Sequence, residues 1–234
     1  RSLDLTTDGA FATGAAVSVA LIVAGYPPIV ATFGGGIGGT LAGTVTGLIH
    51  TRWRVDVILA GILVTTALYS IDLYVMGTGN LSIGGRATVF DLAAGLFPQD
   101  GAAAATRSRD LVALAALLLI VGGHGLVLAW FVGTDLGLAI RATGSNPRMA
   151  KASAIDTGLA TTFGLAVANG CAGLSGALFA QYQGFANVQL GIGMMVMGLA
   201  SVILGEALFF QRTIRQRILA ALLGAVVFRL MVAA

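Results

Sequence analysis

Long, unbroken runs of apolar residues constrain this chain more than any other feature of its sequence. A helix needs about 20 mostly apolar residues to cross a bilayer. A membrane-spanning strand would show apolar and polar residues in alternation, and these runs are continuous. We therefore predict an all-α, polytopic helical membrane protein with about seven transmembrane helices. The predicted segments are Ala10–Ala24, Ile29–His50, Val55–Gly77, Asp110–Gly133, Ile155–Tyr182, Gly191–Phe210 and Ile218–Ala234.

The composition excludes several classes of protein. Of the 234 residues, 57% are hydrophobic and 10% are charged, and the mean hydropathy is +0.92. Soluble domains carry about 25% charged residues, so this chain has too few polar side chains to cover a water-facing surface. A soluble enzyme, a secreted disulfide scaffold and a disordered tail are thus excluded. The net charge of +3 is too diffuse for a nucleic-acid partner, and the single cysteine, Cys171, cannot form an internal disulfide.

The basic residues predict how the chain is oriented in the membrane. Short loops rich in Lys and Arg stay on the cytoplasmic side. Arg1 and the connections after the second, fourth and sixth segments hold most of the basic residues, so these connections are predicted to lie inside. The stretches Gly77–Arg109 and Gln183–Leu190 are predicted to lie outside. The inner set is Arg1, Arg52, Arg54, Arg141, Arg148, Lys151, Arg212, Arg215 and Arg217, and the outer set is Arg86, Arg107 and Arg109.

The connection Asp135–Gly158 is too polar for lipid and too long for a simple turn. It predicts a short helix over Leu136–Ala142, a break at GSNP, and a second helix over Arg148–Ala154. Asn146 is expected to cap the second helix, with Pro147 in its first turn. Such a helix pair is either a docking element for another protein or an amphipathic loop resting on anionic headgroups.

The sequence GLAIRATGSNPRMAKASAIDTG within this connection resembles the cytoplasmic coupling segment of ABC importer permeases of the branched-chain amino-acid/ribose class. Their pattern is G-x-x-x-R-A-x-G-x-N-x-x-x-A, followed by a glycine. Three further stretches, Asp4–Ala16, Leu68–Gly77 and Gly198–Phe209, are similar to the amino-acid-type subgroup. The residues that the resemblance assigns to ATPase coupling are Gly137, Arg141, Ala142, Gly144, Asn146, Pro147 and Ala150.

The resemblance implies a division of labour between subunits. The chain would form a single transmembrane permease domain, residues 1–234, in the inner membrane of a prokaryote, in contact with the lipid bilayer. It would not be an enzyme and would bind no cofactor, since ATP and Mg²⁺ would be held by separate ABC ATPase subunits. The sequence indeed lacks the phosphate-loop pattern G-x-x-x-x-G-K-[ST]. Its further partners would be a second permease subunit, in a homodimer or heterodimer, and an extracytoplasmic substrate-binding protein.

The function implied is import of amino acids, with sugars and nucleosides as alternative cargo of the same class. The scarcity of charged residues favours an apolar pathway, which suits an aromatic or branched amino acid better than a sugar. Permeases of this class usually have eight to ten helices, so we expect this chain to be a fragment. An ion-gradient-driven secondary transporter is the other interpretation, and it would need paired buried charges near the middle of the membrane.

Three polar residues are candidates for the substrate pathway: Tyr69, Asp72 and Asn169. Asp72 lies near the outer end of the third segment, where it would meet a substrate amino group or simply reach water. Asn169 begins the small-residue stripe NGCAGLSG. This stripe predicts either close helix packing or an unwound pathway lining, and in the second case the glycine-rich stretch Phe33–Gly43 could face it.

Two other polar residues in apolar segments have structural interpretations. Glu206 is expected to pair with Arg212 or Arg215 near the cytoplasmic face, rather than to relay protons. His124 is expected to form a hydrogen bond between helices, because a lone histidine in a spanning helix is more often such a link than a metal ligand.

Overall fold

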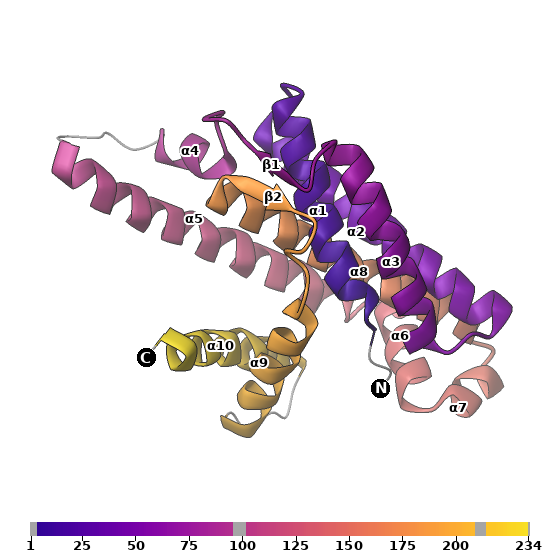
Figure 1. Ribbon diagram of the computed structural model, residues 1–234. Coiled ribbons are helices and arrows are strands. Elements are labelled where there is room, and N and C mark those ends of the chain that lie inside the picture. The colour runs from indigo at the N-terminus through magenta and orange to yellow at the C-terminus, as the bar shows by residue number, and fades with distance from the viewer. Residues whose placement is uncertain (1–3, 96–101, 209–213, 234) are drawn as a thin grey trace.

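The computed structural model describes residues 4–95, 102–208 and 214–233, and it confirms the all-α class (Figure 1). Each of the seven predicted apolar segments forms a helix, and short helices and two short strands lie between them. The seven helices are α1 (Thr6–Val23), α2 (Pro28–Trp53), α3 (Val57–Met76), α5 (Ala102–Phe131), α8 (Thr157–Gln183), α9 (Met194–Leu208) and α10 (Ile214–Ala233).

Five helices in the described part of the chain are long and apolar enough to cross a membrane: α1, α2, α3, α5 from Leu111, and α8. The chain is therefore a multi-pass membrane protein. Helix α9 is apolar but has only 15 residues, which rise about 22 Å and so fall short of a bilayer core of about 30 Å. Membrane crossing by α9 and α10 stays a prediction.

Helices α1 and α5 begin earlier than the apolar pattern predicts. Helix α1 starts at Thr6 rather than Ala10, and the Asp4 side chain accepts a hydrogen bond from the Thr6 backbone N–H at 3.0 Å. Helix α5 starts at Ala102 rather than Asp110, because the alanines before its apolar run have a high helix propensity. In both places, polar or small residues extend a helix that hydropathy alone cuts short.

Helices α1, α2 and α8 form the core, with α3 packed against α1 and α2. Their backbones touch where Gly14, Gly35 and Gly173 meet. A Cβ atom on Gly173 would lie 2.5 Å from the carbonyl oxygen of Gly35, and one on Gly35 would lie 2.6 Å from that of Gly14. Only glycine allows this approach. The stripe NGCAGLSG therefore packs closely against the stretch Phe33–Gly43, within the continuous helix α8.

Helices α9 and α10 pair with each other and lie to one side of this core (Figure 1). Their contact again uses small residues, since a Cβ atom on Gly224 would lie 2.6 Å from the backbone nitrogen of Gly205. The pair meets the core where α9 contacts α1, and α10 also contacts α5.

The outer connections form a small cap that the sequence did not predict. Strand β1 (Asn80–Ser82) pairs antiparallel with β2 (Phe185–Asn187), with Leu81 opposite Ala186. Short helix α4 (Val89–Ala94) follows β1.

The buried Gln181 side chain of α8 joins this cap to the core. Its Oε1 accepts from the Val89 N–H at 3.0 Å, and its Nε2 donates to the hydroxyls of Ser18 and Thr32 at 2.9 and 2.8 Å. One amide side chain therefore ties α4 to α1, α2 and α8.

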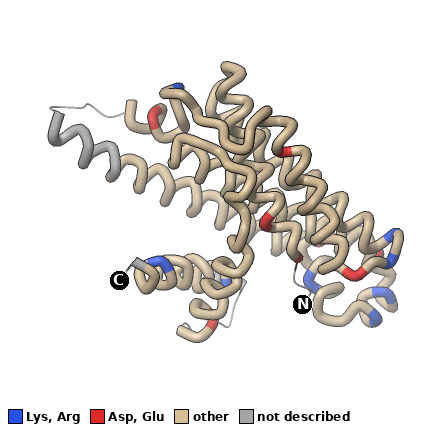
Figure 2. The backbone as a smooth tube through the Cα atoms, viewed as in Figure 1, with Lys and Arg blue, Asp and Glu red and all other residues tan. Residues whose placement is uncertain are grey.

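The opposite end of the molecule carries the coupling segment as two helices, α6 (Asp135–Ser145) and α7 (Pro147–Ala152). They agree with the predicted helix–break–helix arrangement, although α6 extends to Ser145. Figure 2 shows Lys and Arg gathered at this end, on α6, α7 and the turn between α2 and α3. Which side of the membrane this end faces stays a prediction.

Candidate translocation cavity and coupling segment

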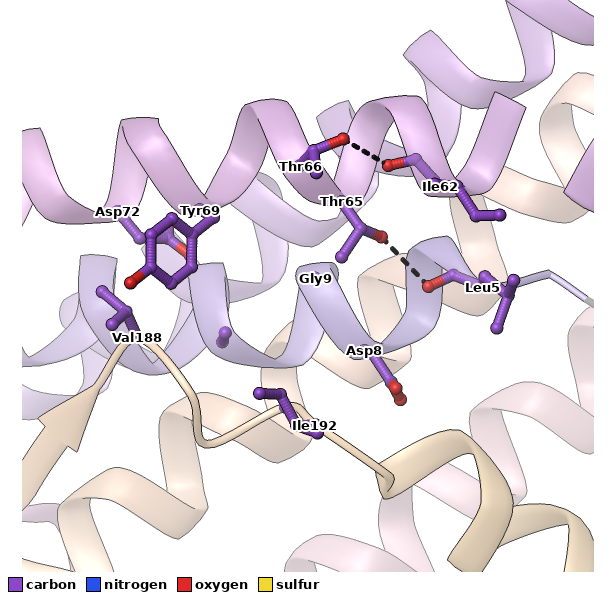
Figure 3. Close-up of a pocket in the computed structure, with 12 residues that line it drawn as sticks. Leu5, Asp8, Gly9, Ile62, Thr65, Thr66, Tyr69, Asp72, Val188 and Ile192 are labelled. Atoms are coloured by element: carbon purple, nitrogen blue, oxygen red, sulfur yellow. Dashed lines mark hydrogen bonds between the residues drawn. The ribbon is translucent and has the colours of Figure 1, made fainter. Parts of the chain in front are cut away.

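A cavity of about 320 Å³ lies between α1, α3 and the irregular segment that leads from β2 to α9 (Figure 3). Its wall is mainly apolar, with a few hydroxyl and carboxylate groups. Irregular backbone at membrane depth is tolerated where it lines such a space. The lining residues are Leu5, Asp8, Gly9, Ala12, Ile62, Thr65, Thr66, Tyr69, Asp72, Val188, Gly191 and Ile192.

Helix α1 begins beside the middle of α8 rather than beside the first residue of that helix. The Asn169 amide donates to Asp4 Oδ2 at 2.6 Å, which fixes the residues before α1 against α8. Asn169 is 12 residues beyond Thr157, so it lies about 18 Å along α8 from the first residue of that helix. This contact holds the start of α1 in place, and Asp8 in the first turn of the helix lines the cavity.

The Asp8 carboxylate caps the start of α9. Its Oδ2 accepts from the Gly193 N–H at 3.1 Å, and its Oδ1 accepts from the Met195 N–H at 2.7 Å. The first N–H groups of a helix have no partner within the helix, and the helix dipole favours a negative charge there. The two backbones touch beside this cap, because a Cβ atom on Gly191 would collide with the Asp8 carbonyl oxygen. Asp8 thus ties α1 to α9.

Asp72 is 1% exposed, and one of its two carboxylate oxygens has a hydrogen-bond partner. Its Oδ2 accepts from the Thr13 hydroxyl at 3.1 Å, whereas its Oδ1 has no hydrogen-bond partner among the described residues. Tyr69, one turn earlier on α3, is 44% exposed. Both residues line the cavity, and the Tyr69 ring lies in front of the Asp72 carboxylate in Figure 3.

The coupling helices have one face on the core and one face exposed. Ile140 of α6 packs against α8, where a Cβ atom on Gly164 would lie 3.2 Å from its Cγ2. Thr143 and Ala150 are buried, while Arg141 and Met149 are exposed. The Asn146 side chain accepts from the N–H groups of Arg148 and Met149, each at 3.1 Å, and so caps α7 as predicted.

Similarity to known proteins shows the family of the chain. The family model described as "Branched-chain amino acid transport system / permease component" matches residues 1–234. The chain belongs to this permease family.

The permease is also similar to individual proteins. It is 32% identical over 226 residues to the tyrosine transport system permease protein of Clostridioides difficile (strain R20291), which covers 97% of this chain and 71% of that protein. It is 33% identical over 215 residues to an uncharacterized protein of Rickettsia prowazekii (strain Madrid E), covering 88% of this chain and 68% of the relative. No solved structure matches the chain.

These matches confirm the resemblance read from the coupling segment. The chain is the membrane-spanning permease component of an ABC importer of the amino-acid type. A permease of such a system works, in general terms, with ATPase and substrate-binding partners.

Two of the three predicted pathway residues of this permease, Tyr69 and Asp72, lie together in the cavity. Asn169 does not line it, and its buried amide instead donates to Asp4 and to the Leu165 carbonyl oxygen. The pathway roles of all three stay predictions, as do the coupling roles of Gly137, Arg141, Ala142, Gly144, Asn146, Pro147 and Ala150.

Asp8 and Thr13 are site residues of the permease that sequence reasoning missed. For Asp8 the signal was present, because LDLTTDGA places two carboxylates and two hydroxyls directly before an apolar run. An acid at membrane depth is costly unless it has partners, and it therefore marks a functional region. The partners of Asp8, Gly193 just before α9 and Met195 in its first turn, are 185 and 187 residues away and leave no local pattern.

The remaining predictions concern His124 and Glu206. His124 Nε2 lies 3.2 Å from Cys171 Sγ, which agrees with the predicted hydrogen bond between helices and joins α5 to α8. Glu206 is exposed on α9. Its predicted ion pair with Arg212 or Arg215 involves side chains that lie outside the described residues.

Proposed function

We propose that this permease forms half of the pathway of a prokaryotic plasma-membrane importer for amino acids with apolar or aromatic side chains. The observation that carries the proposal is the cavity between α1 and α3. Its walls are apolar at Leu5, Ile62 and Ile192, and its polar groups are few. Such a lining suits a small amphipathic molecule, whereas a sugar would need many more hydrogen-bond partners. The similarity to a tyrosine transport system permease supports this substrate class.

The cavity opens on a face of the chain that a second permease subunit would cover. Tyr69 and Ile192, which line it, are 44% and 73% exposed in the isolated chain. In a two-fold assembly the same face of each subunit meets its copy, so two such cavities would face each other across the axis. The pathway would then run between two permease chains, as a homodimer or a paired heterodimer.

The coupling segment would carry the force of ATP hydrolysis into the membrane. Separate ATPase subunits would bind ATP and Mg²⁺. They would dock on the exposed face of α6 and α7, where Arg141 would pair with an acidic groove of the ATPase. The buried face of α6 rests on α8 through Ile140. Because α8 touches α1 and α2 at backbone distance, these helices would move together as one body.

The test of the proposed function is uptake by the assembled transporter in proteoliposomes, with its ATPase and its substrate-binding protein. Radiolabelled tyrosine, leucine and ribose would be compared with and without ATP. We expect ATP-dependent uptake of an apolar or aromatic amino acid and no uptake of ribose. Uptake of ribose alone, or amino-acid uptake that follows an ion gradient without ATP, would overturn the proposal.

A further inference from the structure

The charge distribution inside the cavity is one-sided. Asp8 and Asp72 line it, and none of its lining residues is a Lys, Arg or His. Within the described chain, the hydrogen bonds that these two carboxylates accept come from Thr13 and from backbone N–H groups. The cavity therefore has a negative character and no cationic side chain of its own.

The two carboxylates differ in how many of their oxygens already accept a hydrogen bond. Both oxygens of Asp8 are engaged by N–H groups at the start of α9. Asp72 uses one oxygen on Thr13, and its Oδ1 has no partner among the described residues, although the side chain is 1% exposed. A buried acid with an unused oxygen is costly at membrane depth, and a positively charged ligand would offset that cost.

We infer that Asp72 receives the ammonium group of the amino-acid substrate, so that the permease itself recognises the amine end of its cargo and not the carboxylate end. This inference rests on the proposed function and adds a recognition site within the membrane. An ammonium group is a compact donor with no acceptor, which matches a carboxylate oxygen.

The carboxylate end of the substrate finds no equivalent partner in the cavity. The N–H groups at the start of α9 would suit an anion, but Asp8 already occupies them. The remaining polar groups are the hydroxyls of Thr65, Thr66 and Tyr69. Thr65 donates to the Leu5 carbonyl oxygen and Thr66 to that of Ile62. The cavity therefore discriminates between the two ends of an amino acid.

Tyr69 is the aromatic residue that lines the cavity together with Asp72. The Asp72 Oδ1 atom is buried, and the partly exposed Tyr69 ring lies in front of the carboxylate in Figure 3. Rotation of this ring would change how Asp72 is reached from the cavity, and exposed side chains rotate within nanoseconds. An ammonium group on Asp72 would then lie beside the ring face, where cation–π attraction adds to the carboxylate contact.

The first experiment needs no variant. The full-length permease, assembled with its ATPase and placed in lipid nanodiscs without the substrate-binding protein, is tested for saturable binding of radiolabelled tyrosine. Competitors are tyramine, which keeps the amine and lacks the carboxylate, and N-acetyltyrosine, which keeps the carboxylate and lacks the charged amine. We expect tyramine to displace tyrosine and N-acetyltyrosine to fail. Equal competition by both, or displacement by N-acetyltyrosine alone, would overturn the inference.

The second experiment compares Asp72→Asn with Asp56→Asn. Both changes remove one negative charge from α3, but Asp56 is the exposed cap of that helix, where Asn serves equally well. A charged hydrogen bond is worth enough that Asp72→Asn should weaken tyrosine binding by roughly tenfold or more. Asp56→Asn should bind as the unaltered protein does, and unchanged binding by Asp72→Asn would contradict the inference.

Failure of the inference is distinguishable from failure of the proposed function. If the unaltered permease shows no saturable tyrosine binding, the inference is wrong, yet ATP-dependent uptake of tyrosine with the binding protein present would leave the proposed function standing. If no amino acid is taken up, the proposed function itself fails.

Discussion

The Asp8 carboxylate on α1 accepts a hydrogen bond from the Met195 backbone N–H at the start of α9, with 2.7 Å between Oδ1 and the nitrogen. The two residues are 187 positions apart. This contact and the neighbouring one to Gly193 hold the α9–α10 pair to the core beside the cavity. A change in this link would alter the cavity and the placement of α9 together.

The Asp8 cap can be tested by a pair of substitutions. Asp8→Ala removes both acceptors and should cost about 1 kcal/mol or more, as the loss of a helix cap usually does. Asp8→Asn keeps one acceptor oxygen, so its stability should lie between that of the unaltered protein and that of Asp8→Ala. We expect faster hydrogen exchange at the amides of residues 193–197 in Asp8→Ala. Unchanged exchange there would show that Asp8 does not hold α9.

The glycine contacts in the core predict a strong positional effect. Gly173→Ala places a methyl group 2.5 Å from the Gly35 carbonyl oxygen, so α2 and α8 must separate. Overpacking of this kind costs about 1–3 kcal/mol. We expect a lower thermal unfolding temperature in detergent and weaker transport.

The matched control is Gly123→Ala on α5, where an added Cβ atom meets nothing within 4 Å. It should leave the unfolding temperature unchanged or raise it slightly, since alanine favours helix more than glycine does. Equal destabilisation by the two changes would show that the close contact of Gly173 with Gly35 does not determine the stability of the protein.

The coupling segment predicts an uncoupled variant. Arg141 is exposed on α6, and Arg141→Glu reverses the charge offered to an ATPase without disturbing the buried face of the helix. We expect normal membrane insertion, loss of most substrate uptake, and ATP hydrolysis that substrate no longer stimulates. The measurement is ATPase activity and uptake on the same proteoliposomes.

Arg52→Glu separates coupling from anchoring. Arg52 is also exposed and lies in the last turn of α2, outside α6 and α7. If Arg141 only anchors the chain on the inner side of the membrane, the two reversals should have similar effects. Retention of coupling in Arg141→Glu would contradict the assigned role.

Much of this arrangement was readable from the sequence because its causes are local. Apolar runs predicted the helices, and the Asn146–Pro147 pair predicted the break between α6 and α7. The cap of β1 and β2 and the contacts of Gln181 were not predicted, because their partners lie far apart in sequence and follow no periodic pattern. Part of the cavity lining was predicted. Tyr69 and Asp72 were found as polar residues in an apolar helix, whereas Asp8 was missed because its hydrogen-bond partners at the start of α9 are distant in sequence.

The central claim is that substrate passes through the cavity between α1 and α3, and site-directed thiol labelling tests it most directly. Thr66→Cys places a thiol on the exposed part of the cavity wall, and Ile71→Cys places one on α3 outside it, both in a Cys171→Ser background. The measurement is ATP-driven uptake of labelled tyrosine by the reconstituted transporter after treatment with a bulky thiol reagent. The account predicts that labelling blocks uptake in Thr66→Cys, that excess tyrosine protects against this loss, and that Ile71→Cys is unaffected. Full uptake by labelled Thr66→Cys, or equal loss in both variants, would contradict it.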